Sequence, residues 1–257
     1  MFIYVVSAVM IFTIAAIVTT TLREKHRRQQ LADAALKFGF SFEGDGQNLF
    51  AAGLANLPLF VISQLPRHSE TRNVFRKHLT EADLFICDYH YWTGGNGNNR
   101  FDHDQTVACF LLARPILPEF TLNQRPSNRE REMARMGLRM AGLSARISSS
   151  SFRHALETMV GSLEDEGIQS NAHPKFNQTY CLTSAEHTDE TRALFGGELI
   201  GLLETQAPPL CIQSGGRWLI IYRKDVKAKP DDFGAFSGEV ERVFRILLKA
   251  NEGGKKT

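Results

Sequence analysis

The chain has 257 residues, and its 30 Lys and Arg nearly balance its 28 Asp and Glu, giving a formal net charge of +2. This balance excludes the concentrated basic excess that is typical of nucleic-acid-binding proteins. A hydrophobic fraction of 43% indicates a packed core rather than a disordered chain. The cysteines lie far apart, with neither a C-x-x-C pair nor zinc-ligand spacing, so we expect buried free thiols at Cys87, Cys109, Cys181 and Cys211.

An apolar segment opens the chain, and residues 1–22 contain no Asp, Glu, Lys, Arg or His. As a helix, the run from Phe2 to Leu22 would be about 31 Å long, enough to cross a hydrocarbon core of about 30 Å. A cleaved secretory signal is disfavoured, because no Lys or Arg precedes the run and no small-residue cleavage site ends it. The sequence therefore predicts a single-pass protein of the plasma (inner) membrane.

A basic cluster follows the apolar segment directly. It consists of Arg23, Lys25, Arg27 and Arg28. Because Lys and Arg flank the cytoplasmic end of a membrane span, we expect the N-terminus outside and the body in the cytoplasm. The same side chains are candidates for contact with anionic head groups at the membrane surface. Helix-forming residues 29–38 then lead to Gly39, which predicts a helix ended by a glycine cap. We expect the body to fold without residues 1–28.

The remaining chain predicts an α+β fold, because strands gather in one block and helices mix with strands in the next. Strand-forming runs at 73–79, 84–93 and 101–113 predict an antiparallel meander. The intervening loop, 94–99, is rich in Gly and Asn but lacks the G-K-[ST] motif of a phosphate-binding loop.

The C-terminal half predicts the element order β-α-β-β-α. A strand near 178–183 precedes a helix over 189–206, a hairpin turning at Gly215-Gly216, and an amphipathic helix over 230–250. The expected organisation is a transmembrane helix (1–22), a juxtamembrane basic helix (23–40), a β-rich domain (41–125), an Arg/Met-rich amphipathic connector (126–167), an α+β domain (168–250) and a disordered tail (251–257).

The densest polar cluster flanks the glycine-rich loop. If Trp92 pairs with Phe101 across that loop, His90 lies opposite His103, and Asp88 shares their face of the sheet. Two imidazoles and a carboxylate there would suit a divalent metal or general acid–base chemistry. The plainer alternative is a solvated sheet face, and a pairing shifted by one residue would separate these groups.

The connector carries a second candidate surface. Over residues 129–147, Met, Leu and Ile fall on one helical face, and Arg131, Arg135 and Arg139 fall on another. Such a helix could rest in the head-group layer, adapt to a protein partner through its methionines, or dock on its own core. The three alternatives stay open.

Several short stretches resemble a group of uncharacterised bacterial membrane-anchored proteins. The matching residues are Asp88, Tyr89, Tyr91 and Thr93, then His103, Thr106 and Val107 beyond a polar loop, with Cys87 standing where Phe is usual. Two later stretches are also similar, His173-Pro174-x-Phe176 and Arg192-Ala193-Leu194-Phe195. The resemblance implies one N-terminal membrane span and a cytoplasmic α+β body. It implies no chemistry, because the group has no assigned activity.

No nucleophile motif or cofactor-ligand motif occurs in the sequence. We therefore expect a membrane-tethered cytoplasmic module that is a non-enzymatic interaction or scaffold protein. It would contact lipid through its N-terminal helix and bind a protein partner, without nucleic acid or cofactor. The alternative is a metal-dependent or acid–base enzyme with a site near Asp88, His90 and His103. The pairing of His90 with His103 distinguishes the two hypotheses.

Overall fold

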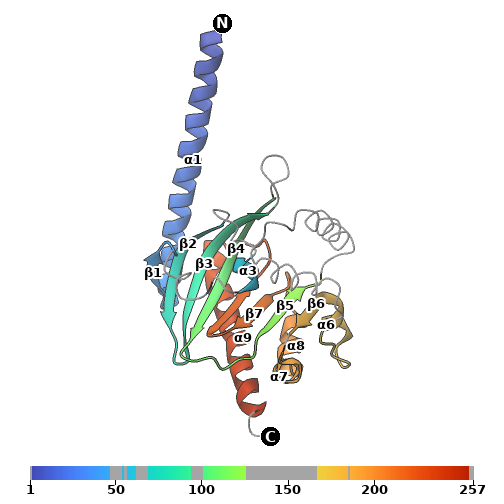
Figure 1. The fold of residues 1–257 in the computed structure, drawn as a ribbon. Coiled ribbons are helices and arrows are strands. Elements are labelled where there is room, and N and C mark those ends of the chain that lie inside the picture. The colour runs from blue at the N-terminus through green and yellow to red at the C-terminus, as the bar shows by residue number, and fades with distance from the viewer. Residues whose placement is uncertain are drawn as a thin grey trace, which may run out of the picture.

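A computed structural model describes residues 2–46, 54, 57–61, 69–93, 101–125, 167–184 and 186–254. It has an α+β fold built on an eight-stranded antiparallel sheet of order β1-β2-β3-β4-β8-β7-β5-β6 (Figure 1). The strands are β1 (Ser41–Gly44), β2 (Ser69–His78), β3 (Ala82–Thr93), β4 (Phe101–Leu112), β5 (Phe120–Gln124), β6 (Tyr180–Thr183), β7 (Cys211–Gly215) and β8 (Trp218–Tyr222). The helices are α1 (Phe2–Lys37), α3 (Pro58–Val61), α6 (Pro174–Thr179), α7 (Thr188–Leu194), α8 (Gly197–Glu204), the 3-10 turn η2 (Pro230–Asp232) and α9 (Phe233–Gly254).

The sheet joins the two parts of the chain that the sequence analysis treats as separate domains. Strand β4 pairs with β8 from Val107↔Tyr222 to Leu111↔Trp218. Strand β5 lies between β6 and β7, both of which follow it by many residues. The expected division between 41–125 and 168–250 is therefore corrected, because hydrogen bonds between strands cross it. Residues 126–166 lie outside the described part of the chain.

One face of the sheet is covered by helices and holds the larger core. Alternate residues of β3 and β4 point to this face, among them Leu84, Ile86 and Phe110. Phe110 stacks on Phe244 of α9 with ring centroids 4.3 Å apart. The apolar stripe expected on the C-terminal helix is buried here, at Phe233, Phe236, Val240, Val243, Phe244 and Leu247.

The expected helix over 189–206 is two helices in the structure. Helix α7 ends before Phe195, whose backbone leaves the helical region at φ −88° and ψ 58°, and α8 starts at Gly197. The adjacent Gly196 and Gly197 explain the break, since glycine is the most weakly helix-forming residue after proline. The hairpin of β7 and β8 turns at Gly216 as expected, with a φ of +58° that favours glycine.

The opposite face of the sheet buries a second cluster that includes three of the four cysteines. Cys87, Cys109 and Cys211 lie there with Tyr89 and Phe60. All four cysteines are free and buried, as the sequence predicts. Burial raises the pKa of the Cys109 thiol well above its ordinary value. Because the thiolate is the reactive form of cysteine, such a thiol is unreactive at neutral pH.

The N-terminal helix is continuous over 36 residues, and its first half extends beyond the sheet (Figure 1). It ends at Lys37, and the expected glycine cap follows at Gly39, which has a φ of +80°, while the Phe40 N–H donates to the Ala35 carbonyl. Large apolar side chains are exposed along its outer part, at Met10, Phe12, Val18 and Leu22. Among the described residues, no helix combines the length and apolarity of a membrane-crossing segment.

The first residues of β3 give a pH-dependent contribution to stability. Asp83 contacts Arg76 Nη2 at 2.8 Å and His78 Nδ1 at 2.5 Å. Burial raises the pKa of this carboxyl, but the hydrogen bonds and charges of Arg76 and His78 outweigh burial and leave the pKa below 3.8. A carboxyl with a lowered folded-state pKa stabilises the protein above its unfolded pKa of about 3.9, and this contribution is lost as the pH falls.

We therefore expect Asp83→Asn to be destabilising at pH 7 and pH 5, with the difference from the wild type shrinking below about pH 4. Urea unfolding at pH 7, 5 and 3 measures it. A difference that grows toward pH 3 would contradict the assigned ion pairs.

Candidate functional site at the base of the N-terminal helix

Among the described strand residues, one buried carboxylate, that of Asp88, interrupts the apolar, helix-covered face of the sheet. Asp88 follows Leu84 and Ile86 at every second position of β3, so its side chain points toward the base of α1. This side chain is only 8% exposed. A charge that has left water needs both an ionic partner and hydrogen bonds to stay ionised at acceptable cost.

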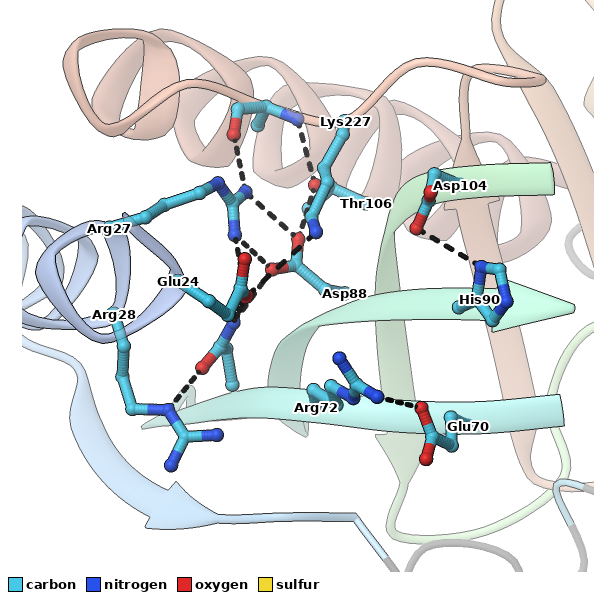
Figure 2. A network of polar contacts seen from close by, with 12 residues as sticks. Glu24, Arg27, Arg28, Glu70, Arg72, Asp88, His90, Asp104, Thr106 and Lys227 are labelled. Carbon is cyan, nitrogen blue, oxygen red and sulfur yellow. Dashed lines mark hydrogen bonds and ion pairs between the residues drawn. The ribbon is translucent and has the colours of Figure 1, made fainter. Parts of the chain in front are cut away.

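Arg27 of α1 supplies the ionic partner (Figure 2). Its guanidinium is bidentate, with Nη1 2.5 Å from Asp88 Oδ2 and Nη2 3.2 Å from Oδ1. The Thr106 hydroxyl donates to Oδ1 at 3.0 Å, and the Asn73 amide donates to Oδ2 at 2.9 Å. Each carboxylate oxygen thus accepts two hydrogen bonds, which satisfies its lone pairs.

Asn73 reaches the carboxylate because β2 is bulged at this point. The register of β2 against β3 shifts between Arg72 and Phe75, and Asn73 has a φ of +52°. Asparagine tolerates this left-handed conformation better than most residues. Its side-chain oxygen accepts a 2.8 Å hydrogen bond from Arg28 Nε. The bulge therefore connects a second arginine of α1 to the same buried group.

The loop after β8 completes the arrangement. The N–H of Ala228 donates to the Thr106 hydroxyl at 2.8 Å, and its carbonyl accepts from Arg27 Nη2 at 2.9 Å. We call this set the Asp88 joint; it comprises Arg27, Arg28, Asn73, Asp88, Thr106 and Ala228. Below it, Leu31 and Ala35 of α1 enter the main core. Helix α1 is therefore fixed to the body by a buried ion pair and by apolar packing.

The metal or acid–base site predicted from the sequence is not assembled, because the register of β3 against β4 differs by one residue. Phe101 pairs with Thr93 rather than Trp92, so His90 lies opposite Asp104 and His103 opposite Tyr91. Side chains alternate along a strand, so this shift places His90 and His103 on opposite faces.

The two histidines have separate surroundings. His90 Nδ1 lies 3.3 Å from Asp104 Oδ1, on the face of Asp88. His103 Nδ1 lies 2.7 Å from Asp225 Oδ1, and its ring stacks on Tyr91 with centroids 4.6 Å apart. Within the described ranges, no group of three or more His, Cys, Asp and Glu is placed to hold a metal ion. The enzyme hypothesis loses the geometry on which it rested.

The predicted membrane-surface cations divide into two sets. Arg23 and Lys25 are exposed, whereas Arg27 and Arg28 turn toward the body and form the Asp88 joint. The other three, Arg131, Arg135 and Arg139, lie outside the described residues.

Asn73 and Ala228 were not predicted from the sequence as parts of a site. Asp88 was placed with the histidines, although a lone carboxylate in line with Leu84 and Ile86 signals a buried ion pair. The residues that carry the family resemblance also divide, with Asp88 and Thr106 in the joint and Tyr89, Tyr91 and Val107 in the core of the opposite face.

Comparison with known proteins assigns no family. No family model matches the chain, and no curated protein matches it. Among solved structures, the chain is similar to the crystal structure of the mycobacterial trehalose monomycolate transport factor A, TtfA. The TM-score is 0.49 at 11% sequence identity, and the match covers 87% of this chain and 94% of that one. A similarity at this level transfers neither an activity nor a ligand.

Proposed function

We propose that this protein is a membrane-tethered cytoplasmic module without enzymatic activity, which presents a rigidly held body to a protein partner. The tether is the first part of α1, which has no Asp, Glu, Lys, Arg or His through position 22 and exposes Met10, Phe12, Val18 and Leu22. Four Lys and Arg follow within six residues, which favours a body on the cytoplasmic side.

The bidentate contact between Arg27 and Asp88 is the observation that carries the proposal. A protein that is only tethered to a membrane can be joined to its anchor by a flexible polar linker, and such a linker needs no buried ion pair. Here a single helix runs from the apolar segment to Lys37, and the ion pair of Arg27 with Asp88 joins this helix to β3. The body is thereby held at one angle to the helix that anchors it. A fixed orientation suits a scaffold that must offer one surface to a partner near the bilayer.

The membrane topology is tested with reporters fused after Thr257. We expect a reporter that works only outside the cytoplasm to be silent and one that works only inside to be active, because the basic cluster holds its flank in the cytoplasm. Both fusions must be present at equal protein levels. The reverse pattern of activities would overturn the proposed location.

The rigid attachment is tested by the distance between spin labels at Phe12→Cys on α1 and Lys249→Cys on α9, side chains that are 81% and 80% exposed. The native thiols are buried and do not compete for the label. In the full chain in bilayers, we expect a narrow distance distribution that broadens when Arg27→Gln is added. Asp83→Asn is the control, since Asp83 lies on the same sheet but away from α1. Equal widths in all three proteins would show that the joint does not set the orientation.

A further inference from the structure

A cleft beside the Asp88 joint has the position and chemistry of a phosphate site. It has a volume of about 490 Å³ and lies between α1 and β2. Its lining residues are Thr21, Glu24, Lys25, Arg28 and Arg72. Lys25 and Arg28 are one turn apart on α1, and Arg72 of β2 lines the same cleft from the sheet. Figure 2 shows Arg28 on α1 and Arg72 on β2, with the Arg72 guanidinium directed toward Glu70. Three cations and one carboxylate, Glu24, therefore line one space between two elements that are distant in the sequence. Arg27 and Lys227 lie 3.9 and 4.0 Å from Glu24 Oε1, so the surroundings of the cleft stay cationic.

The cations of the cleft keep hydrogen-bonding capacity after their contacts within the protein. The side chain of Lys25 is exposed and forms no hydrogen bond or ion pair with the described residues. Arg28 uses Nε for Asn73 and Nη2 for Asp45, which leaves donors on a guanidinium that has five. Within the part of the chain that the structure describes, the side chain of Arg72 forms one ion pair, with the exposed Glu70. Guanidinium and ammonium groups are the side chains that bind phosphate oxygens most strongly.

The cleft also lies at the level where the apolar part of α1 ends. Thr21 lines it, and Leu22 is exposed beside it. Val18, Leu22 and Lys25 follow each other at helical spacing, so an apolar strip runs along α1 directly to the cleft. A phospholipid has a matching order of groups, with acyl chains above a phosphate. A free phosphate ion would leave the apolar strip unused.

We infer that this cleft binds the phosphate of an anionic phospholipid, with Lys25, Arg28 and Arg72 as donors. The inference rests on the proposed membrane anchoring, and it goes beyond the basic flank predicted from the sequence in two ways. It adds Arg72, which lies on the sheet, and it leaves out two members of that flank: Arg27, which is committed to Asp88, and Arg23, which lies outside the cleft. The site places the head group against the joint, so lipid binding and the orientation of the body share the same helix turn.

The test uses the full chain in phosphatidylcholine bilayer discs containing increasing amounts of phosphatidylglycerol. The measurement is the number of phosphatidylglycerol molecules retained per protein after transfer to a mild detergent, by native mass spectrometry. We expect Lys25→Gln and Arg72→Gln each to weaken retention about fivefold, as the loss of one basic contact at an anionic surface implies. Arg23→Gln is the matched control, because Arg23 lies at the same depth on α1 but outside the cleft.

The outcomes separate this site from the anchoring itself. If the protein floats with neutral vesicles but Arg23→Gln and Lys25→Gln weaken retention equally, or Arg72→Gln has no effect, the head-group site is wrong and the anchor stands. If the full chain fails to float with any vesicle, both the anchor and the site are overturned. Displacement of the lipid by millimolar inorganic phosphate, with the same dependence on Lys25 and Arg72, would assign the cleft to a soluble phosphate instead and overturn the lipid.

Discussion

Replacing Asp88 with alanine should lower the free energy of unfolding by about 3–5 kcal/mol, the range measured when one partner of a buried ion pair is removed. The Arg27 side chain is only 20% exposed and would lose its counter-charge. The amide of Asn73, which is fully buried, and the hydroxyl of Thr106 would lose their acceptor as well. Urea unfolding of the full chain in a mild detergent, followed by tryptophan fluorescence, measures the change.

The control is Asp83→Ala, on the same strand. Asp83 also forms an ion pair, but its side chain is 26% exposed, and we expect its removal to cost about 1 kcal/mol or less at neutral pH. The double variant Arg27→Ala/Asp88→Ala should lose less unfolding free energy than the two single variants lose together. Each single change leaves a buried charge without its partner, and the double change removes both charges. If Asp88→Ala were no more harmful than Asp83→Ala, the joint would contribute little to the fold.

Two truncations that differ by six residues should behave very differently. Removal of residues 1–22 leaves Arg27 and Arg28 on the helix that packs into the core through Leu31 and Ala35. We expect that chain to keep nearly the full stability of the body. Removal of residues 1–28 deletes both arginines and leaves Asp88 buried without a counter-charge, with an expected loss of about 3 kcal/mol or more. Unfolding by urea, compared in the same buffer, gives both values.

This expectation revises the view from the sequence that the body folds without residues 1–28. The shorter deletion is the internal control, since it removes the same apolar segment and changes nothing in the joint. Equal unfolding free energies for the two truncated chains would refute the structural role of Arg27 and Arg28. A large loss of stability in both would instead assign that role to the first 22 residues.

The Asp88 joint changes the expected effect of substitutions at Arg27. Arg27 and Asp88 are 61 positions apart, yet each supplies the counter-charge that the other needs. A change at Arg27 would be interpreted from the sequence as a change in membrane orientation, since it belongs to a basic flank. From its contacts, the first effect of such a change is on the stability of the sheet beneath the helix.

The sequence by itself determined the local elements, because these depend on interactions between near neighbours. The apolar stripe of α9, the glycine cap of α1 at Gly39 and the hairpin turn at Gly216 were all predicted, and each follows from helical spacing or from a glycine at a positive φ. The α+β class and the burial of the cysteines followed from the same patterns and from composition.

Only the tertiary structure decided which elements meet and in what register. Alternation along a strand shows which residues share a face, but it does not identify the neighbouring strand, so the pairing of β4 with β8 was not predicted. Nor did the glycine-rich stretch after Thr93 define the β3–β4 register, and an error of one residue moved His103 to the opposite face from His90. The sequence also did not identify Arg27 as the partner of Asp88. A buried charge requires a counter-charge, but only the folded arrangement of α1 against β3 brings Arg27 to this carboxylate.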